Sequence, residues 1–119
     1  MKVLAVTLYG IKTCDTVRKA RAWLDNIGVE HAFHDYKKDG IDRSRLQGWL
    51  DELGWEAVLN RRGTTFRSLP EAARQNLDAD RALALMLDQP SMIRRPVLDL
   101  GERRLVGFDP ALYAAALET

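Results

Sequence analysis

The stretch Thr7-Leu8-Tyr9-Gly10-Ile11-Lys12-Thr13-Cys14-Asp15-Thr16-Val17-Arg18-Lys19-Ala20 decides the fold of this chain. An apolar run from Val3 to Tyr9 predicts a buried strand, and Gly10 interrupts it. A helical pattern begins after a short loop, with the chain's only cysteine, Cys14, at its start. The order strand, loop, cysteine, helix is the outline of a thiol site.

The position of Cys14 has two interpretations. The first turn of a helix presents unpaired N–H groups and the positive end of the helix dipole, which favour a thiolate. Lys12 and Arg18 add positive charge nearby, and Asp15 opposes it. The alternative is a small, packed apolar residue, as many free cysteines are. The local sequence leaves both open.

The composition predicts one domain of 119 residues, in which 46% hydrophobic residues suffice for a core. The net charge of +1 and the mixing of both signs give no indication of a nucleic-acid-binding surface. A single cysteine excludes an internal disulfide and fits a reducing compartment. No stretch approaches the about 20 apolar residues that span a bilayer, and the apolar N-terminal run is too short for a signal peptide. We therefore expect a cytoplasmic protein without membrane contact.

The first half of the chain predicts a β-α-β unit followed by helices. One helical face is formed by Val17, Ala20, Leu24 and Ile27, Gly28 ends that helix, and residues 29–36 read as a second strand. After a polar turn at residues 37–40, Asp42 is the predicted N-cap of a helix whose apolar stripe is Leu46, Trp49, Leu50 and Leu53. Asp78 is the predicted N-cap of a later helix over residues 79–87, which Pro90 terminates.

The C-terminal part predicts a hairpin and a last helix. Residues 96–100 and 103–108 flank the turn Gly101-Glu102 and read as two antiparallel strands. Asp109 and Pro110 then begin a helix with Leu112, Ala115 and Ala116 expected inward. The chain is thus predicted to be α/β, with a thioredoxin-like fold and a four-stranded mixed sheet. We expect a single domain over 1–119 with a helical insertion at about 41–90.

Four separated blocks of the sequence form one recognisable pattern. They are Leu8-Tyr9-Gly10-Ile11-Lys12-Thr13-Cys14-Asp15-Thr16 with residues 18–24, Asn60-Arg61-Arg62-Gly63-Thr64-Thr65-Phe66-Arg67-Ser68-Leu69, Gln89-Pro90-Ser91-Met92-Ile93-Arg94-Arg95-Pro96-Val97, and Leu105-Val106-Gly107-Phe108. In this order they resemble the arsenate-reductase-like (ArsC) family, most closely its YffB branch, with the Spx regulators as neighbours. The resemblance covers essentially the whole chain. It implies that Cys14 is a nucleophile, that Arg95 lies beside it, and that Pro96 follows a cis peptide bond, as is typical of thioredoxin-like domains.

Three positions depart from the relatives' patterns. The family's arsenate reductases use three arginines to hold the oxyanion; the first falls on Asn60 and the third on Gly107. Arsenate reduction is therefore the least favoured function. The Spx regulators carry Cys-x-x-Cys, whereas Val17 occupies the second position here, so no internal resolving thiol exists. Spx-like binding to RNA polymerase does not need that thiol.

The leading hypothesis is a monothiol reductase of the ArsC family. Cys14 would form a mixed disulfide that an external thiol, glutathione, resolves. Arg95 with Arg61 or Arg62 would pair with the glutathione carboxylates, and Lys12 and Pro96 are further expected contacts. The alternative is an adaptor that binds RNA polymerase without turnover.

No other motif in the sequence predicts a catalytic or binding site. We expect no bound cofactor or metal, because His31 and His34 have no cysteine partner at ligand spacing. We also expect no direct nucleic-acid contact. Asp35 and Asp99 are interpreted as structural residues.

Overall fold

A computed structural model describes residues 6–117. The chain divides into two compact units, of which one joins the residues before Tyr36 to those from Arg95 onward and the other is Tyr36–Arg94. The predicted strand over residues 3–9 lies partly outside the described residues. The predictions of a single domain over 1–119 and of an insertion at about 41–90 stay predictions.

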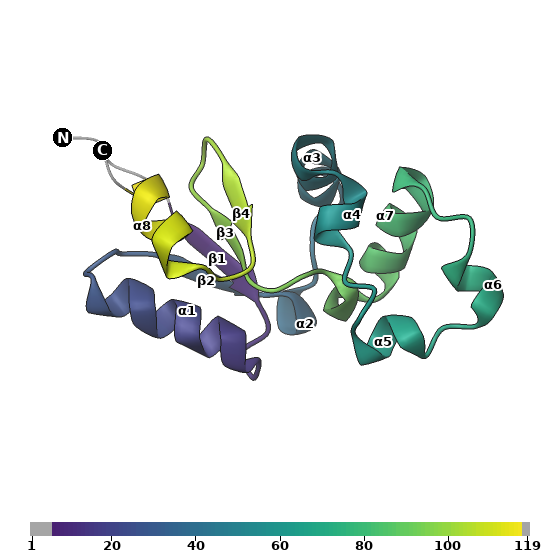
Figure 1. The fold of residues 1–119 in the computed structure, drawn as a ribbon, viewed down its shortest axis with the longest axis horizontal. Helices are drawn as coiled ribbons and strands as arrows, with labels where there is room; N and C mark the ends of the chain where they lie inside the picture. The colour runs from purple at the N-terminus through teal and green to yellow at the C-terminus, as the bar shows by residue number, and fades with distance from the viewer. Residues whose placement is uncertain (1–5, 118–119) are drawn as a thin grey trace. The chain divides into compact units, whose positions relative to one another are not determined.

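The first unit is a mixed sheet with two helices. Its elements are β1 (Thr7–Gly10), α1 (Asp15–Asn26), β2 (Ala32–Asp35), β3 (Val97–Asp99), β4 (Arg104–Val106) and α8 (Pro110–Leu117) (Figure 1). The strand order is β2-β1-β3-β4, with β1 parallel to β2 and antiparallel to β3, and with β3 antiparallel to β4. The predicted four-stranded mixed sheet and its β-α-β and β-β-α halves are confirmed.

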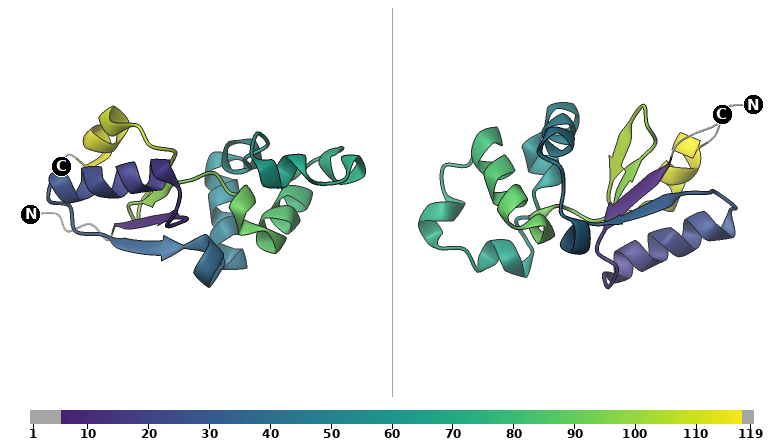
Figure 2. Two further views of the ribbon diagram at one scale, coloured as in Figure 1. Left: turned by 90° about the horizontal axis from the view of Figure 1, so that it is seen from below. Right: turned by 180° about the vertical axis from the view of Figure 1, so that it is seen from behind.

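Both helices of this unit cover one face of the sheet (Figure 2, left). Leu8 and Leu98 lie opposite each other on β1 and β3 and point to the same face. They form one buried cluster with Val17, Ala20 and Leu24 of α1 and Tyr113 of α8. Trp23 adds an edge contact to Tyr113, with ring centroids 5.8 Å apart. The predicted apolar face of α1 is confirmed at these three positions.

Three predicted core positions are wrong. Ile27 is 48% exposed, since it is the C-cap that follows the last residue of α1, Asn26, and Gly28 after it has a φ of +75°. Leu112 is 57% exposed and Ala115 is also exposed, whereas Tyr113 is buried. Because α8 is apolar on every side, its sequence carries no amphipathic signal. Its buried face carries Tyr113, whose hydroxyl donates to the carbonyl of Gly107.

The second unit consists of short helices. They are α2 (Tyr36–Asp39), α3 (Arg43–Leu53), α4 (Trp55–Val58), α5 (Thr64–Arg67), α6 (Glu71–Arg74), α7 (Ala79–Asp88) and the 3-10 turn η1 (Pro90–Met92). The predicted caps are confirmed, since Asp42 accepts from Arg45 N–H at 3.0 Å and Asp78 accepts from Arg81 N–H at 2.8 Å. The predicted polar turn at residues 37–40 is instead the helical turn α2, and the second strand is shorter than predicted because Tyr36 begins that turn.

The core of the second unit lies between α3, α4 and α7. Its largest fully buried side chains are Tyr36, Leu46, Trp49, Leu59, Met86, Met92 and Ile93. A single β-bridge pairs Leu59 with Ile93, and Asn60 N–H donates to the Met92 carbonyl at 2.7 Å. Among the helices of residues 6–117, none combines the length and the apolar character that crossing a bilayer demands.

Candidate active site around Cys14

Cys14 is the N-cap of α1. Its backbone is extended, with φ −75° and ψ 127°, and its side chain is partly buried. Cys14 N–H donates to the Ile11 carbonyl at 3.0 Å, and the Cys14 carbonyl accepts from Arg18 N–H at 3.0 Å. The first bond closes the turn before the helix and the second begins the helix, so the thiol sits where the sequence predicted it.

The surroundings of the thiol favour its ionised form. Partial burial raises the pKa of Cys14, but the backbone N–H of Val17, a hydrogen bond from the Arg95 side chain, the N–H of Thr16 and the charge of Arg95 together lower that pKa below its ordinary value. The helix start and one guanidinium thus outweigh desolvation. A thiol whose pKa is lowered in this way and that reaches solvent is a candidate nucleophile.

Arg95 and Pro96 come to the thiol from the start of β3. The Arg95–Pro96 peptide bond is cis, as the family resemblance implied. Pro96 is buried, and its carbonyl accepts from Gly107 N–H at 2.8 Å, which ties the segment to the residue after β4. Arg95 is partly buried whereas its neighbour Arg94 is exposed, so the two arginines have different surroundings. Within the first unit, the structure therefore brings Arg95 to Cys14, and the role of Pro96 at the thiol stays a prediction.

The other charges near Cys14 are solvent-exposed. Lys12 is exposed in the loop before the helix. Arg18 and Asp15 form a 3.2 Å ion pair on the surface of α1, with side chains 61% and 86% exposed. The charge of Arg18 is therefore paired with that of Asp15 and contributes little to stabilising the Cys14 thiolate. From the sequence alone, Arg18 counts as positive charge near the thiol.

From the sequence, Asp35 is interpreted as a structural residue but is not connected with the thiol loop. Asp35 ends β2 directly opposite Gly10, and its Oδ2 accepts the backbone N–H of Lys12 at 3.1 Å. The two residues are 23 positions apart in the chain, so no local pattern connects them. The contact could have been predicted from the register of β1 against β2, because these parallel strands end side by side at Gly10 and Asp35.

Arg61 and Arg62 belong to the second unit, and their role at the thiol stays a prediction. The guanidinium of Arg61 lies 5.5 Å from the Trp55 ring centroid and 3.7 Å from the Glu56 carboxylate. Arg62 is exposed, and its backbone N–H donates to the side chain of Asn60 at 3.1 Å. The two guanidinium groups therefore differ, since that of Arg61 already has a carboxylate and an aromatic face as neighbours.

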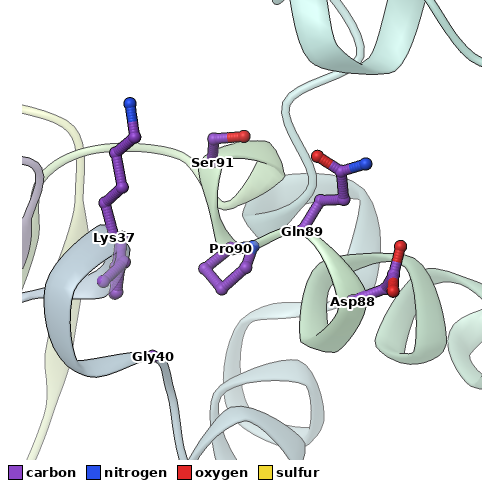
Figure 3. A pocket seen from close by; sticks show the side chains of 7 residues that line it. Lys37, Gly40, Asp88, Gln89, Pro90 and Ser91 are labelled. Atoms are coloured by element: carbon purple, nitrogen blue, oxygen red, sulfur yellow. The ribbon is translucent and has the colours of Figure 1, made fainter.

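The second unit also holds an open pocket of about 340 Å³. Figure 3 shows Lys37 and Asp88 on opposite sides of it, with Pro90 between them. Its lining residues are Tyr36, Lys37, Gly40, Asp88, Gln89, Pro90 and Ser91. Across residues 6–117, no cluster of three or more His, Cys, Asp or Glu side chains is placed to hold a metal ion.

A family model described as the ArsC family matches residues 9–116, a range that includes both Cys14 and Arg95. The chain belongs to the ArsC family. The solved structure of a YffB protein is 60% identical in sequence to this chain. The match has a TM-score of 0.93 and covers 96% of this chain and 100% of the YffB chain. A solution structure of an arsenate reductase related protein from Brucella melitensis is 51% identical, with a TM-score of 0.77 over 100% and 99%.

Two further relatives are an uncharacterized protein and a transcriptional regulator. An uncharacterized protein of Haemophilus influenzae is 40% identical over 93% of this chain and 97% of its own length. The global transcriptional regulator Spx of Streptococcus pyogenes is 30% identical over 87% of this chain and 78% of its own length. The α/β thioredoxin-like fold is confirmed, and the chain has both arsenate-reductase-like and Spx-like relatives.

Proposed function

We propose that this protein is a glutathione-dependent monothiol reductase in which Cys14 forms a mixed disulfide. The observation that carries the proposal is the hydrogen bond from Arg95 to a thiol at a helix start, where the pKa of Cys14 is lowered. Such a thiolate attacks disulfides faster at neutral pH than an ordinary cysteine, because a larger fraction of it is ionised. Since Cys14 is the chain's only cysteine, a second molecule must resolve the adduct.

The reaction runs in two exchange steps. The Cys14 thiolate attacks the glutathione sulfur of a disulfide R–S–S–G, forms Cys14–S–S–G and releases R–S⁻, which takes a proton from solvent. A glutathione thiolate then attacks the glutathione sulfur of the adduct, releases the Cys14 thiolate and leaves oxidised glutathione. The net reaction converts R–S–S–G and one reduced glutathione into R–SH and oxidised glutathione, so the sulfur of R is reduced and one glutathione thiol is oxidised. Arg95 stabilises the Cys14 thiolate before the first step and as the leaving group of the second.

Recognition of glutathione requires cations for its carboxylates. Arg95 is partly buried beside the sulfur and can serve both the thiolate and an adduct. Of the two predicted arginines of the second unit, Arg62 is the better candidate, because Arg61 already contacts Glu56 and Trp55. Lys12 is the exposed cation of the thiol loop. Bidentate pairing of guanidinium with carboxylate is the contact we assign to Arg62.

A turnover assay tests the proposal. Purified protein is given a glutathionylated peptide and reduced glutathione, and oxidised glutathione is followed through glutathione reductase. We expect catalysis that Cys14→Ser abolishes and that Arg62→Met weakens by raising KM more than Arg61→Met does. If the wild-type rate equals the rate with glutathione alone, the reductase proposal fails.

A second candidate is an Spx-like adaptor that contacts RNA polymerase without turnover. The similarity to Spx of Streptococcus pyogenes over 87% of this chain favours it. Contact through the fold would not require the thiol, so the complex should survive Cys14→Ser. Co-purification of the tagged wild type and Cys14→Ser with polymerase tests this function, and the absence of polymerase from both would reject it.

Arsenate reduction remains the least favoured function. The position that matches the family's third oxyanion arginine is Gly107, which has no side chain and whose N–H is used by the Pro96 carbonyl. An arsenate dianion would therefore lack one cationic ligand. Arsenate-dependent turnover with glutathione and glutaredoxin would overturn this inference.

A further inference from the structure

The loop between β1 and α1, residues 11–14, carries the thiol. Cys14 N–H donates to the Ile11 carbonyl at 3.0 Å, which closes the last turn of the loop on itself. That bond gives the loop its local shape but does not attach it to the sheet. Arg95 reaches the thiol from the segment just before β3, and a contact from another strand to this loop would help to hold Cys14 at a fixed distance from Arg95.

Asp35 supplies that contact. It is the last residue of β2 and is paired in register with Gly10, the last residue of β1. Its Oδ2 accepts the N–H of Lys12 at 3.1 Å, so a partly buried carboxylate at the end of one strand holds the loop that leaves its neighbour. Hydrogen bonds to ionised acceptors are the stronger class, and this one anchors the loop two residues before the thiol.

We infer that Asp35 is a positioning residue for Cys14, acting through the backbone N–H of Lys12 to hold the thiol beside Arg95. The inference rests on Cys14 being the working thiol of the proposed function. The described contact of Asp35 is to a backbone N–H, and its negative charge by itself would disfavour a thiolate. Its contribution is therefore geometric, since it holds the loop that carries Cys14 to the helix start, where the backbone of Val17 and Thr16 lowers the pKa of Cys14.

The contact that Asp35 makes and its negative charge act on the pKa of Cys14 in opposite directions, so variants can separate the two effects. Asp35→Asn removes the charge but keeps a side-chain oxygen as an acceptor, so the pKa of Cys14 should stay at its wild-type value or fall slightly. Asp35→Ala and Asp35→Leu remove the acceptor, so Cys14 should spend less time beside Arg95 and its pKa should rise. We expect a rise of about half a unit to one unit, and therefore a roughly three- to tenfold slower alkylation at a pH below both pKa values.

The experiment combines two measurements on the full chain. Alkylation of Cys14 by iodoacetamide is followed as a function of pH, and amide hydrogen exchange of Lys12 is measured by NMR. Lys12 should be protected in the wild type and in Asp35→Asn and should exchange faster in Asp35→Ala and Asp35→Leu. The matched control is Asp25→Ala, which removes an exposed carboxylate of α1 from the same unit and should change neither quantity.

Several outcomes would overturn the inference. They are wild-type exchange of Lys12 at the rate of an unstructured peptide, an unchanged alkylation profile in folded Asp35→Ala or Asp35→Leu, and an Asp35→Asn pKa that rises as much as that of Asp35→Ala. The first needs no variant to fold. Because iodoacetamide replaces glutathione throughout, an inert wild type in the turnover assay would reject the reductase while leaving this test standing.

Discussion

Replacing Arg95 by methionine should raise the pKa of Cys14, because the variant loses both the hydrogen bond and the charge that favour the thiolate. A hydrogen bond to a charged group is worth roughly 1.5–3 kcal/mol, which corresponds to about one to two pKa units. Cys14 is only partly buried, so solvent screens the charge and the lower end applies. We therefore expect a rise of about one unit.

The assay is the absorbance of the thiolate at 240 nm, or the rate of Cys14 alkylation, followed against pH. Below both pKa values the alkylation rate of Arg95→Met should be roughly tenfold lower than that of the wild type, and above both it should be similar. Arg94→Met is the control, because Arg94 is the exposed neighbour of the same charge. Coincident titration curves for the wild type and Arg95→Met would refute the assignment of Arg95 to the thiol.

Three further substitutions test the scaffold. Gly10→Ala would place a Cβ 2.6 Å from Cγ2 of buried Val17, so we expect a loss of about 1–3 kcal/mol in unfolding free energy by denaturant titration, partly restored in the double variant with Val17→Ala. Burial raises the pKa of Tyr113, so the stability that its protonated hydroxyl contributes is complete below the unfolded pKa of about 10 and is lost as the pH rises through the folded pKa. Tyr113→Phe should remove this loss of stability at alkaline pH and should lower the unfolding free energy by about 1 kcal/mol at neutral pH. Asp42→Ala removes the N-cap of α3 and should cost about 1 kcal/mol, read from the thermal midpoint.

Much of the fold was predictable because short-range patterns specify it. The N-cap position of Cys14 and the buried face of Val17, Ala20 and Leu24 follow from helical spacing and are confirmed. The caps at Asp42 and Asp78 follow from side-chain chemistry and are also confirmed. Each of these features depends on residues within one or two helical turns.

The features that the sequence did not predict depend on residues far apart in the chain, or lie on a helix whose faces are equally apolar. Helix α8 gives no apolar stripe to choose from, so the inward position of Tyr113 and the outward position of Leu112 could not be predicted. The contact of Asp35 with the thiol loop requires the register of two strands. The meeting of Arg95 with Cys14 was expected only from the family resemblance, because no spacing rule connects residues so far apart.

The proposed reductase requires that Cys14 be a reactive thiol whose adduct is resolved from outside the chain. Intact-protein mass spectrometry after incubation with oxidised glutathione at neutral pH is the most direct test of this requirement. We expect one glutathione added per chain, none on Cys14→Ser, and complete loss of the adduct when reduced glutathione is supplied. An unmodified wild-type chain under conditions that modify a free cysteine peptide would contradict it.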